Sequence, residues 1–142
     1  MKRKNLIAIK KVKKKEVVIK NLKILNFYKK FEYTISKDIK NKNFALAVSG
    51  GADSLCLAYF SKIYSKKFKS KIYVLIVNHN LRKESYKEAL KVKKILCKKR
   101  ISSKILNWKG GIPKSNIQRN ARDMRYFLIS NYCLKKNIKQ NS

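Results

Sequence analysis

The chain has 142 residues, with 38 Lys and Arg against 7 Asp and Glu, and its formal charge is +31. This length fits one domain or part of one, and a hydrophobic content of 44% excludes a disordered tail because it is enough to build a core. No apolar run approaches the roughly eighteen residues of a membrane helix, and the apolar stretch near the start is too short for a secretory signal, so we expect a cytoplasmic protein.

The excess of cationic side chains predicts attraction to polyanions, because each Lys or Arg docked on a phosphate releases condensed counterions. Nucleic acid is the natural partner. The alternative is genome composition, since AT-rich codons favour Lys, Asn and Ile whatever the protein binds.

The oligomeric state stays open, with a homodimer among the options. Cys56, Cys97 and Cys133 form no Cys-x-x-Cys pair, so we expect buried thiols and no metal or redox site.

A basic arm and a short helix are expected before the main domain. Residues 1–20 are basic and lack a clear period, whereas the apolar positions from residue 21 onward fit one helical stripe. A polar break at residues 41–43 follows this helix. We therefore divide the chain into an amino-terminal part over residues 1–40 and a second domain over residues 41–142.

Strands and helices alternate through the second domain. Continuous apolar runs predict buried strands over residues 44–48 and 71–77, and residues 103–108 are expected to form a third strand. Apolar side chains at helical spacing predict helices over residues 53–64, 84–99 and 116–135. This alternation implies a parallel sheet with helices on both faces, so the fold class is α/β. Three unusual segments follow the strand ends, where such sheets bind ligands, and should converge on one cleft; they are residues 49–54, 78–82 and 108–118.

The segment Ser49-Gly50-Gly51-Ala52-Asp53-Ser54 joins the first strand to the next helix. Two glycines let the backbone turn sharply and bring its N–H groups against an anion, and the following helix directs its positive dipole end to the same point. Ser49 and Ser54 can add hydroxyl donors, so the segment predicts a pyrophosphate-binding loop. Asp53 would repel a bare phosphate, and we expect it to be a magnesium ligand or the helix N-cap. The alternative is a Gly-Gly turn with a capped helix.

This loop resembles the S-G-G-x-D-S signature of the PP-loop ATP pyrophosphatases, which cleave ATP between its α and β phosphates and adenylate a substrate oxygen. Two further segments, residues 77–82 and 116–126, resemble those of the tRNA(Ile)-lysidine synthase family at the same distances from the loop. The resemblance runs from about residue 42 to residue 132. Family members usually carry Gly where this chain has Asn80, and Asn is the residue that next best tolerates a positive φ.

The resemblance implies a ligase that uses ATP and Mg²⁺ to join free lysine to C2 of the wobble cytidine in tRNA(Ile), through an adenylated cytidine. Asp53 and Arg122 would be the catalytic residues, and Asp53 would also hold the metal. The expected ATP-binding residues are Ser49, Gly50, Gly51, Ala52, Asp53, Ser54, His79 and Arg125.

The last predicted helix carries Gln118, Arg122 and Arg125 at positions i, i+4 and i+7, so they share a face suited to gripping phosphate or carboxylate. The alternative is a solvated basic face. His79, the only histidine, follows a strand end and is expected to line the cleft and orient ATP or the target base. Its alternative is a packed or water-facing loop residue. We assign Trp108 to the core.

Members of the family continue past the matching segment with a His- and Asp-rich motif. We therefore expect the domain to be truncated at its carboxyl end, without the acidic groups that would hold lysine. Three alternatives follow. The chain is an enzyme whose remainder comes from another chain, an inactive remnant that keeps nucleotide or RNA binding, or another PP-loop tRNA-modifying enzyme such as a sulfur transferase. The lack of paired cysteines weighs against sulfur transfer.

Overall fold

The computed structural model describes residues 19–112 and 114–138. The chain divides into two compact units, the first ending at Lys37 and the second beginning at Asp38, whereas the sequence suggested a boundary after residue 40. Residues 1–18 of the expected basic arm lie outside the described residues.

The first unit contains one described helix, α2, over Leu22–Ser36. Asn21 caps its start, because the Asn21 side-chain oxygen accepts hydrogen bonds from the backbone N–H groups of Lys23 at 2.9 Å and Ile24 at 3.4 Å. The helix predicted from the apolar stripe is confirmed.

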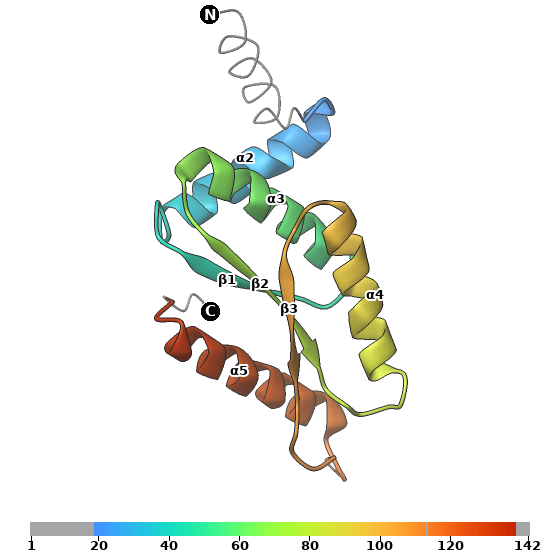
Figure 1. Cartoon of the computed structure of the whole chain (residues 1–142). Coiled ribbons are helices and arrows are strands. Elements are labelled where there is room, and N and C mark those ends of the chain that lie inside the picture. Colours follow the sequence, from blue (N-terminus) through green and yellow to red (C-terminus); the bar gives the residue numbers. More distant parts are fainter. Residues whose placement is uncertain (1–18, 113, 139–142) are drawn as a thin grey trace, which may run out of the picture. The chain divides into compact units, whose positions relative to one another are not determined.

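The second unit is built on a parallel sheet of three strands in the order β1-β2-β3 (Figure 1). The strands are β1 (Phe44–Val48), β2 (Ile72–Asn78) and β3 (Ser103–Asn107). In the register, Ile76 of β2 lies opposite Val48 of β1 and Ile105 of β3. All three carboxyl ends therefore meet at one edge of the sheet, as the α/β prediction requires.

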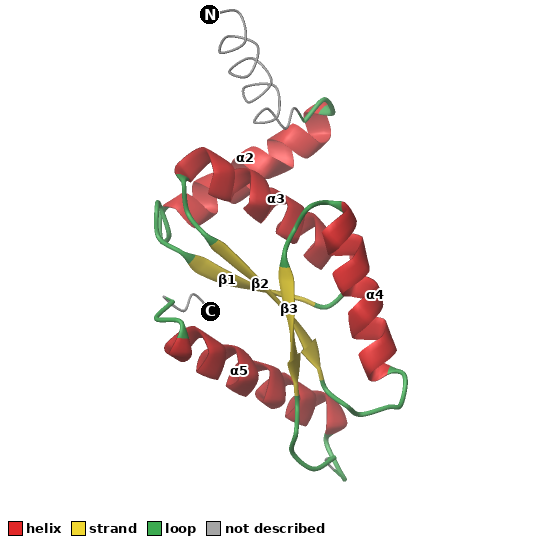
Figure 2. Ribbon diagram, in the orientation of Figure 1, coloured by secondary structure: helices red, strands yellow, loops and turns green. Residues whose placement is uncertain are grey.

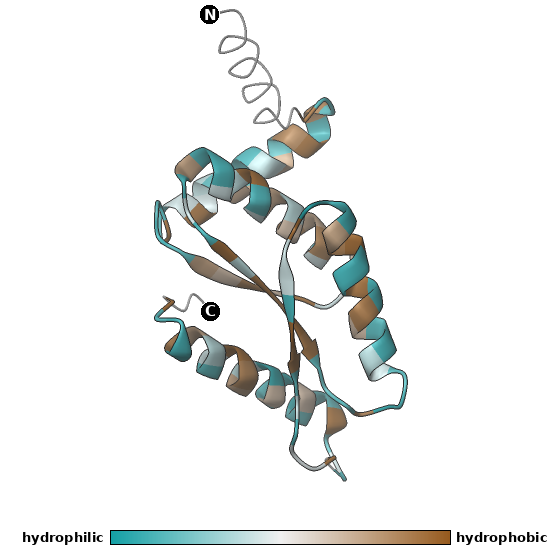
Figure 3. Cartoon of the chain, in the orientation of Figure 1, coloured by the Kyte–Doolittle hydropathy of each residue, from teal (hydrophilic) through white to brown (hydrophobic). Residues whose placement is uncertain are grey.

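Helices cover both faces of this sheet (Figure 2). The helices α3 (Ala52–Phe68) and α4 (Ser85–Lys98) pack on one face, and α5 (Ile117–Lys135) packs on the other. The strands between them are largely apolar (Figure 3). The main core cluster, between the sheet and the first two of these helices, consists of Val48, Ala58, Val74, Ile76, Ala89, Val92, Leu96 and Ile101. The predicted layers are confirmed.

Two details differ from the sequence predictions. Helix α3 ends at Phe68 rather than at residue 64, because Lys69 adopts a left-handed φ of 52° and donates its N–H to the Ser65 carbonyl, so the helix stops only there. The prediction of buried thiols is right for Cys133 and wrong for Cys56 and Cys97, which lie exposed on α3 and α4.

Within the described parts of the chain, none of the helices is both long and apolar enough to cross a membrane.

Candidate functional site

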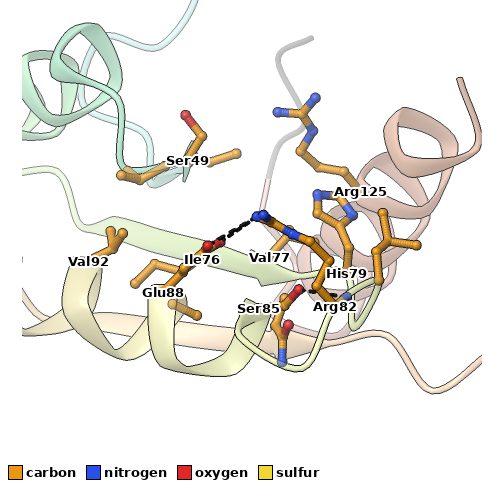
Figure 4. Close-up of a pocket in the computed structure, with 14 residues that line it drawn as sticks. Ser49, Ile76, Val77, His79, Arg82, Ser85, Glu88, Val92 and Arg125 are labelled. Atoms are coloured by element: carbon orange, nitrogen blue, oxygen red, sulfur yellow. Dashed lines mark hydrogen bonds and ion pairs between the residues drawn. The ribbon is translucent and has the colours of Figure 1, made fainter. Parts of the chain in front are cut away.

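A hollow of about 190 Å³ opens at the carboxyl ends of β1 and β2 (Figure 4). We call it the carboxyl-edge hollow. Its walls come from the two strand ends, the loop after β2, the first half of α4 and one side chain of α5. The polar side chains that line it are Ser49, Asn78, His79, Arg82, Ser85, Glu88 and Arg125. Of the three segments that were expected to converge, the second lines the hollow together with Ser49 of the first. The other expected loop residues, 50–54, follow Ser49 along the chain but lie outside the lining.

Gly50 forms the tight turn between β1 and α3. Its φ is +93°, a conformation that side chains rarely adopt. A Cβ atom at this position would also lie 2.7 Å from Cγ2 of Val92, closer than any real contact. Gly51 has an ordinary extended conformation, and a Cβ there would meet only Ser49 Oγ at 3.9 Å. The fold therefore requires glycine at position 50 and leaves position 51 free.

The amino end of α3 carries no side-chain cap, because its N-cap residue is Gly51. The N–H groups of the first turn of a helix have no partner within the helix, so they remain available to an anion. Ser54 holds the loop from inside, since its hydroxyl donates to the Gly51 carbonyl at 3.0 Å and accepts from the Ser49 backbone N–H at 3.3 Å. The two serine hydroxyl oxygens lie 3.3 Å apart. These contacts fix both hydroxyls at the mouth of the turn.

Asp53 is exposed in the first turn of α3. Because Gly51 is the N-cap, the expectation that Asp53 could cap the helix is wrong. Magnesium commonly binds proteins through one or two carboxylates and completes its shell with phosphate and water oxygens. A single exposed carboxylate beside an open anion site fits that pattern. Within the described residues no group of three or more His, Cys, Asp or Glu side chains could hold a metal by itself.

His79 and Arg125 stand together on the α5 side of the hollow (Figure 4). Burial lowers the pKa of His79 below its usual 6.5, and the nearby Arg125 guanidinium lowers this pKa further. His79 is therefore neutral at physiological pH. Its Nδ1 atom is buried and has no hydrogen-bond partner in the described part of the chain. A neutral imidazole beside the Arg125 cation adds no charge of its own to the hollow.

Arg82 and Glu88 form an ion pair across the hollow (Figure 4). The Arg82 Nη2 atom lies 3.1 Å from Oε1 and 3.0 Å from Oε2 of Glu88. Arg82 belongs to residues 78–82, which were expected to reach the cleft, but neither it nor Glu88 was named as a site residue. Arg82 could have been singled out, because it is an arginine in a lysine-rich chain and follows a strand end. Nothing in the sequence marks Glu88.

Asparagine side chains fix the loop after β2. Asn78 is 2% exposed, and its amide donates to the side-chain oxygens of Asn80 and Asn107, each at 2.9 Å. Asn80 has a φ of 54° and donates from its amide to the Trp108 carbonyl at 2.6 Å. The turn expected to survive with Asn in place of Gly is confirmed. These bonds tie the ends of β2 and β3 and position His79 between Asn78 and Asn80.

Of the three polar residues expected to share one clamp on α5, Arg125 alone lines the carboxyl-edge hollow. Arg122 is exposed and lies outside its lining. Gln118 lines a different hollow at the start of α5. Trp108, assigned to the core, is half-buried, and its ring meets that of Phe127 edge-on at 5.9 Å between centroids.

Comparison with known proteins gives one family and several relatives. A family described as the PP-loop domain matches residues 19–140. The tRNA(Ile)-lysidine synthase of Rickettsia rickettsii (strain Sheila Smith) is 36% identical over 114 residues, which are 78% of this chain and 24% of that protein. The tRNA(Ile)-lysidine synthase of Orientia tsutsugamushi (strain Boryong) is 40% identical over 99 residues, which are 70% of this chain and 22% of that protein. The chain thus spans about a quarter of the length of the curated relatives it matches.

Two solved structures share the fold. A U34-tRNA thiolase from Methanococcus maripaludis aligns with a TM-score of 0.62 and 19% identity, over 79% of this chain and 43% of that one. An NH3-dependent NAD synthetase from Campylobacter jejuni aligns with a TM-score of 0.51 and 19% identity, over 82% of this chain and 53% of that one. At these identities the likeness supports the parallel α/β fold alone.

Proposed function

Since the chain belongs to the PP-loop domain family, we propose that it binds ATP in the carboxyl-edge hollow and serves the ATP-dependent formation of lysidine in tRNA(Ile). The relatives that are 36% and 40% identical to it carry the name of that reaction. The observation that supports the proposal most strongly is the uncapped amino end of α3 beside the Gly50 turn, because it offers free N–H groups to a phosphate chain.

The reaction would proceed in two steps. The C2 oxygen of cytosine is a poor leaving group, so it first attacks the α phosphate of ATP, and the bond to the β phosphate breaks. Pyrophosphate departs and leaves an adenylated cytidine. The amine of lysine then attacks C2 and displaces AMP.

The residues of the hollow and of the adjoining Ser49–Ser54 loop suit the first step. The N–H groups at the start of α3 and the hydroxyls of Ser49 and Ser54 would hold the phosphates that leave as pyrophosphate. Arg125 would offset the charge that develops there, and neutral His79 would orient the nucleotide or the target base. Arg122 is proposed as a second countercharge, on ATP or on the RNA backbone.

Asp53 would hold Mg²⁺ together with the phosphate oxygens. That ion would supply charge neutralisation on the departing pyrophosphate. The homodimer and the cytoplasmic location suggested by the sequence stay predictions.

The experiment that tests the proposal follows pyrophosphate release by the purified chain with ATP, lysine and a tRNA(Ile) transcript. We expect release that depends on both lysine and tRNA, and its loss in the Asp53→Ala variant. ATP binding without release would support a nucleotide-binding remnant. A chain that binds no ATP would contradict the proposal.

A further inference from the structure

A second hollow, of about 430 Å³, lies at the opposite edge of the sheet, where the strands begin. We call it the amino-edge hollow. It is lined by the residues just before each strand, the last turns of α3 and the turn between α4 and β3. None of the residues assigned above to the carboxyl-edge hollow lines it.

The side chains around the amino-edge hollow are strongly cationic. Its lining includes five cations and no Asp or Glu, and these cations are Lys62, Lys66, Lys69, Lys71 and Arg100. Four of them lie within residues 62–71, from the end of α3 up to the start of β2, and Arg100 comes from the turn before β3, so folding adds Arg100 to a basic stretch of the sequence. Charges of one sign held this close repel one another unless an anion lies between them.

The fold holds this cluster together despite the repulsion. The Lys62 ammonium donates to the Lys99 carbonyl at 2.9 Å and also to the Arg100 carbonyl, which ties α3 to the turn before β3. Burial lowers the pKa of Lys62 first, and the charges of Lys66 and Arg100 lower it further. Lys62 thus lies between two further cations, Lys66 and Arg100, that line the same hollow.

One buried polar group in the same hollow lacks a partner. Ser70 is 7% exposed, and its hydroxyl makes no hydrogen bond within the described residues. Buried hydroxyls in proteins are nearly always paired. An acceptor oxygen that entered the hollow would lie close to this unpaired donor and among the cations.

We propose that the amino-edge hollow binds backbone phosphates of an RNA, as a contact surface separate from the nucleotide site. Five cations exceed what one phosphate ion can neutralise, whereas a nucleic-acid backbone offers one charge at every nucleotide. The hollow is open to solvent, which suits an extended polyanion. This inference rests on the proposed function only in taking tRNA(Ile) as the RNA.

The test compares two double variants that remove equal charge. Lys66→Gln with Lys69→Gln changes the hollow, and Lys87→Gln with Lys94→Gln removes two exposed lysines from the outer side of α4. Binding of a labelled tRNA(Ile) transcript is measured over a series of salt concentrations. Thermal unfolding verifies that each variant folds, and ATP binding is measured on every protein.

The hollow variant is expected to bind the RNA roughly tenfold or more weakly, with a salt slope smaller by about two, whereas the α4 variant changes little. ATP binding stays the same in both. An equal loss in the two variants would overturn the proposal, because the RNA would then respond to total charge alone. If the parent protein binds no ATP but the hollow variant still loses RNA binding, only the proposed function fails.

If the hollow variant does not fold, a measurement on the chain without substitutions tests the proposal instead. The rate at which each lysine is acetylated is measured by mass spectrometry with and without the RNA. We expect at least about threefold slower modification of Lys66, Lys69 and Lys71 in the complex, with little change at Lys87 and Lys94. Uniform protection of all five lysines would overturn the proposal.

Discussion

Replacing Gly50 by alanine tests the geometry of the loop most sharply. The substitution puts a side chain at φ +93°, and conformations of this kind cost about 1–3 kcal/mol. The new Cβ would also lie 2.7 Å from Cγ2 of Val92, and overpacking a core typically costs about 1–3 kcal/mol. We expect Gly50→Ala to lower the free energy of unfolding by about 2–6 kcal/mol, the sum of these two costs.

Gly51→Ala is the matched control, because its φ of −66° is ordinary and its nearest neighbour would be 3.9 Å away. We expect its free energy of unfolding to change by about 1 kcal/mol or less. Urea unfolding of both variants gives the comparison, and equal destabilisation would refute the reasoning. Adding Val92→Ala to Gly50→Ala removes the clash. The double variant should therefore lose less unfolding free energy than the sum of the losses in the two single variants.

Three further predictions concern the carboxyl-edge hollow. Asp53→Ala should abolish ATP turnover and leave tRNA binding nearly unchanged; equal turnover in variant and parent would remove Asp53 from the site. His79 gives the only imidazole signal in an NMR titration, and its pKa should lie below 6.5. As the pH falls, the unfolded chain therefore takes up the imidazole proton before the folded chain does. The free energy of unfolding should fall as the pH drops through 6.5 toward the pKa of folded His79, and His79→Gln should remove this dependence. A measured His79 pKa at or above 6.5 would contradict this prediction. Glu88→Gln should strengthen pyrophosphate binding by freeing Arg82 and change stability by about 1 kcal/mol or less, because both side chains are more than half exposed; calorimetry showing weaker binding would argue against a ligand-facing Arg82.

The sequence predicts the layers of the fold because the relevant signals are local. Strands β1 and β2 are short apolar runs between polar breaks, and the helices repeat their apolar residues at helical spacing. The end of α3 could have been placed further along the chain, because Phe60, Tyr64 and Phe68 continue the helical spacing to its last turn. The stop itself is set by the left-handed backbone of Lys69, which no apolar pattern marks.

The candidate site divides in the same way. The Ser49–Ser54 loop can be found from its residues, because a strand, a glycine pair and a helix follow directly in the chain. Arg122 and Arg125 cannot be told apart from sequence, since they are three positions apart on one helix. Only the rotation of α5 on the sheet decides which of them reaches the hollow, and this rotation is set by the burial of Met124 and Cys133.

The Arg82–Glu88 pair and the amino-edge hollow also need the folded chain. Glu88 is one of several acidic residues on predicted helices, and only the start of α4 brings it beside Arg82. The five cations of the amino-edge hollow are scattered among 38 Lys and Arg. Folding brings Arg100, from the turn before β3, beside the four lysines of residues 62–71.

The most direct test of the account is a crystal structure of the chain with Mg²⁺ and a non-hydrolysable ATP analogue. We predict that the phosphates lie against the first turn of α3, next to Gly51 and Ser49, with Arg125 within contact distance. An analogue bound at saturating concentration in another place, or a carboxyl-edge hollow free of phosphate density, would contradict the central claim.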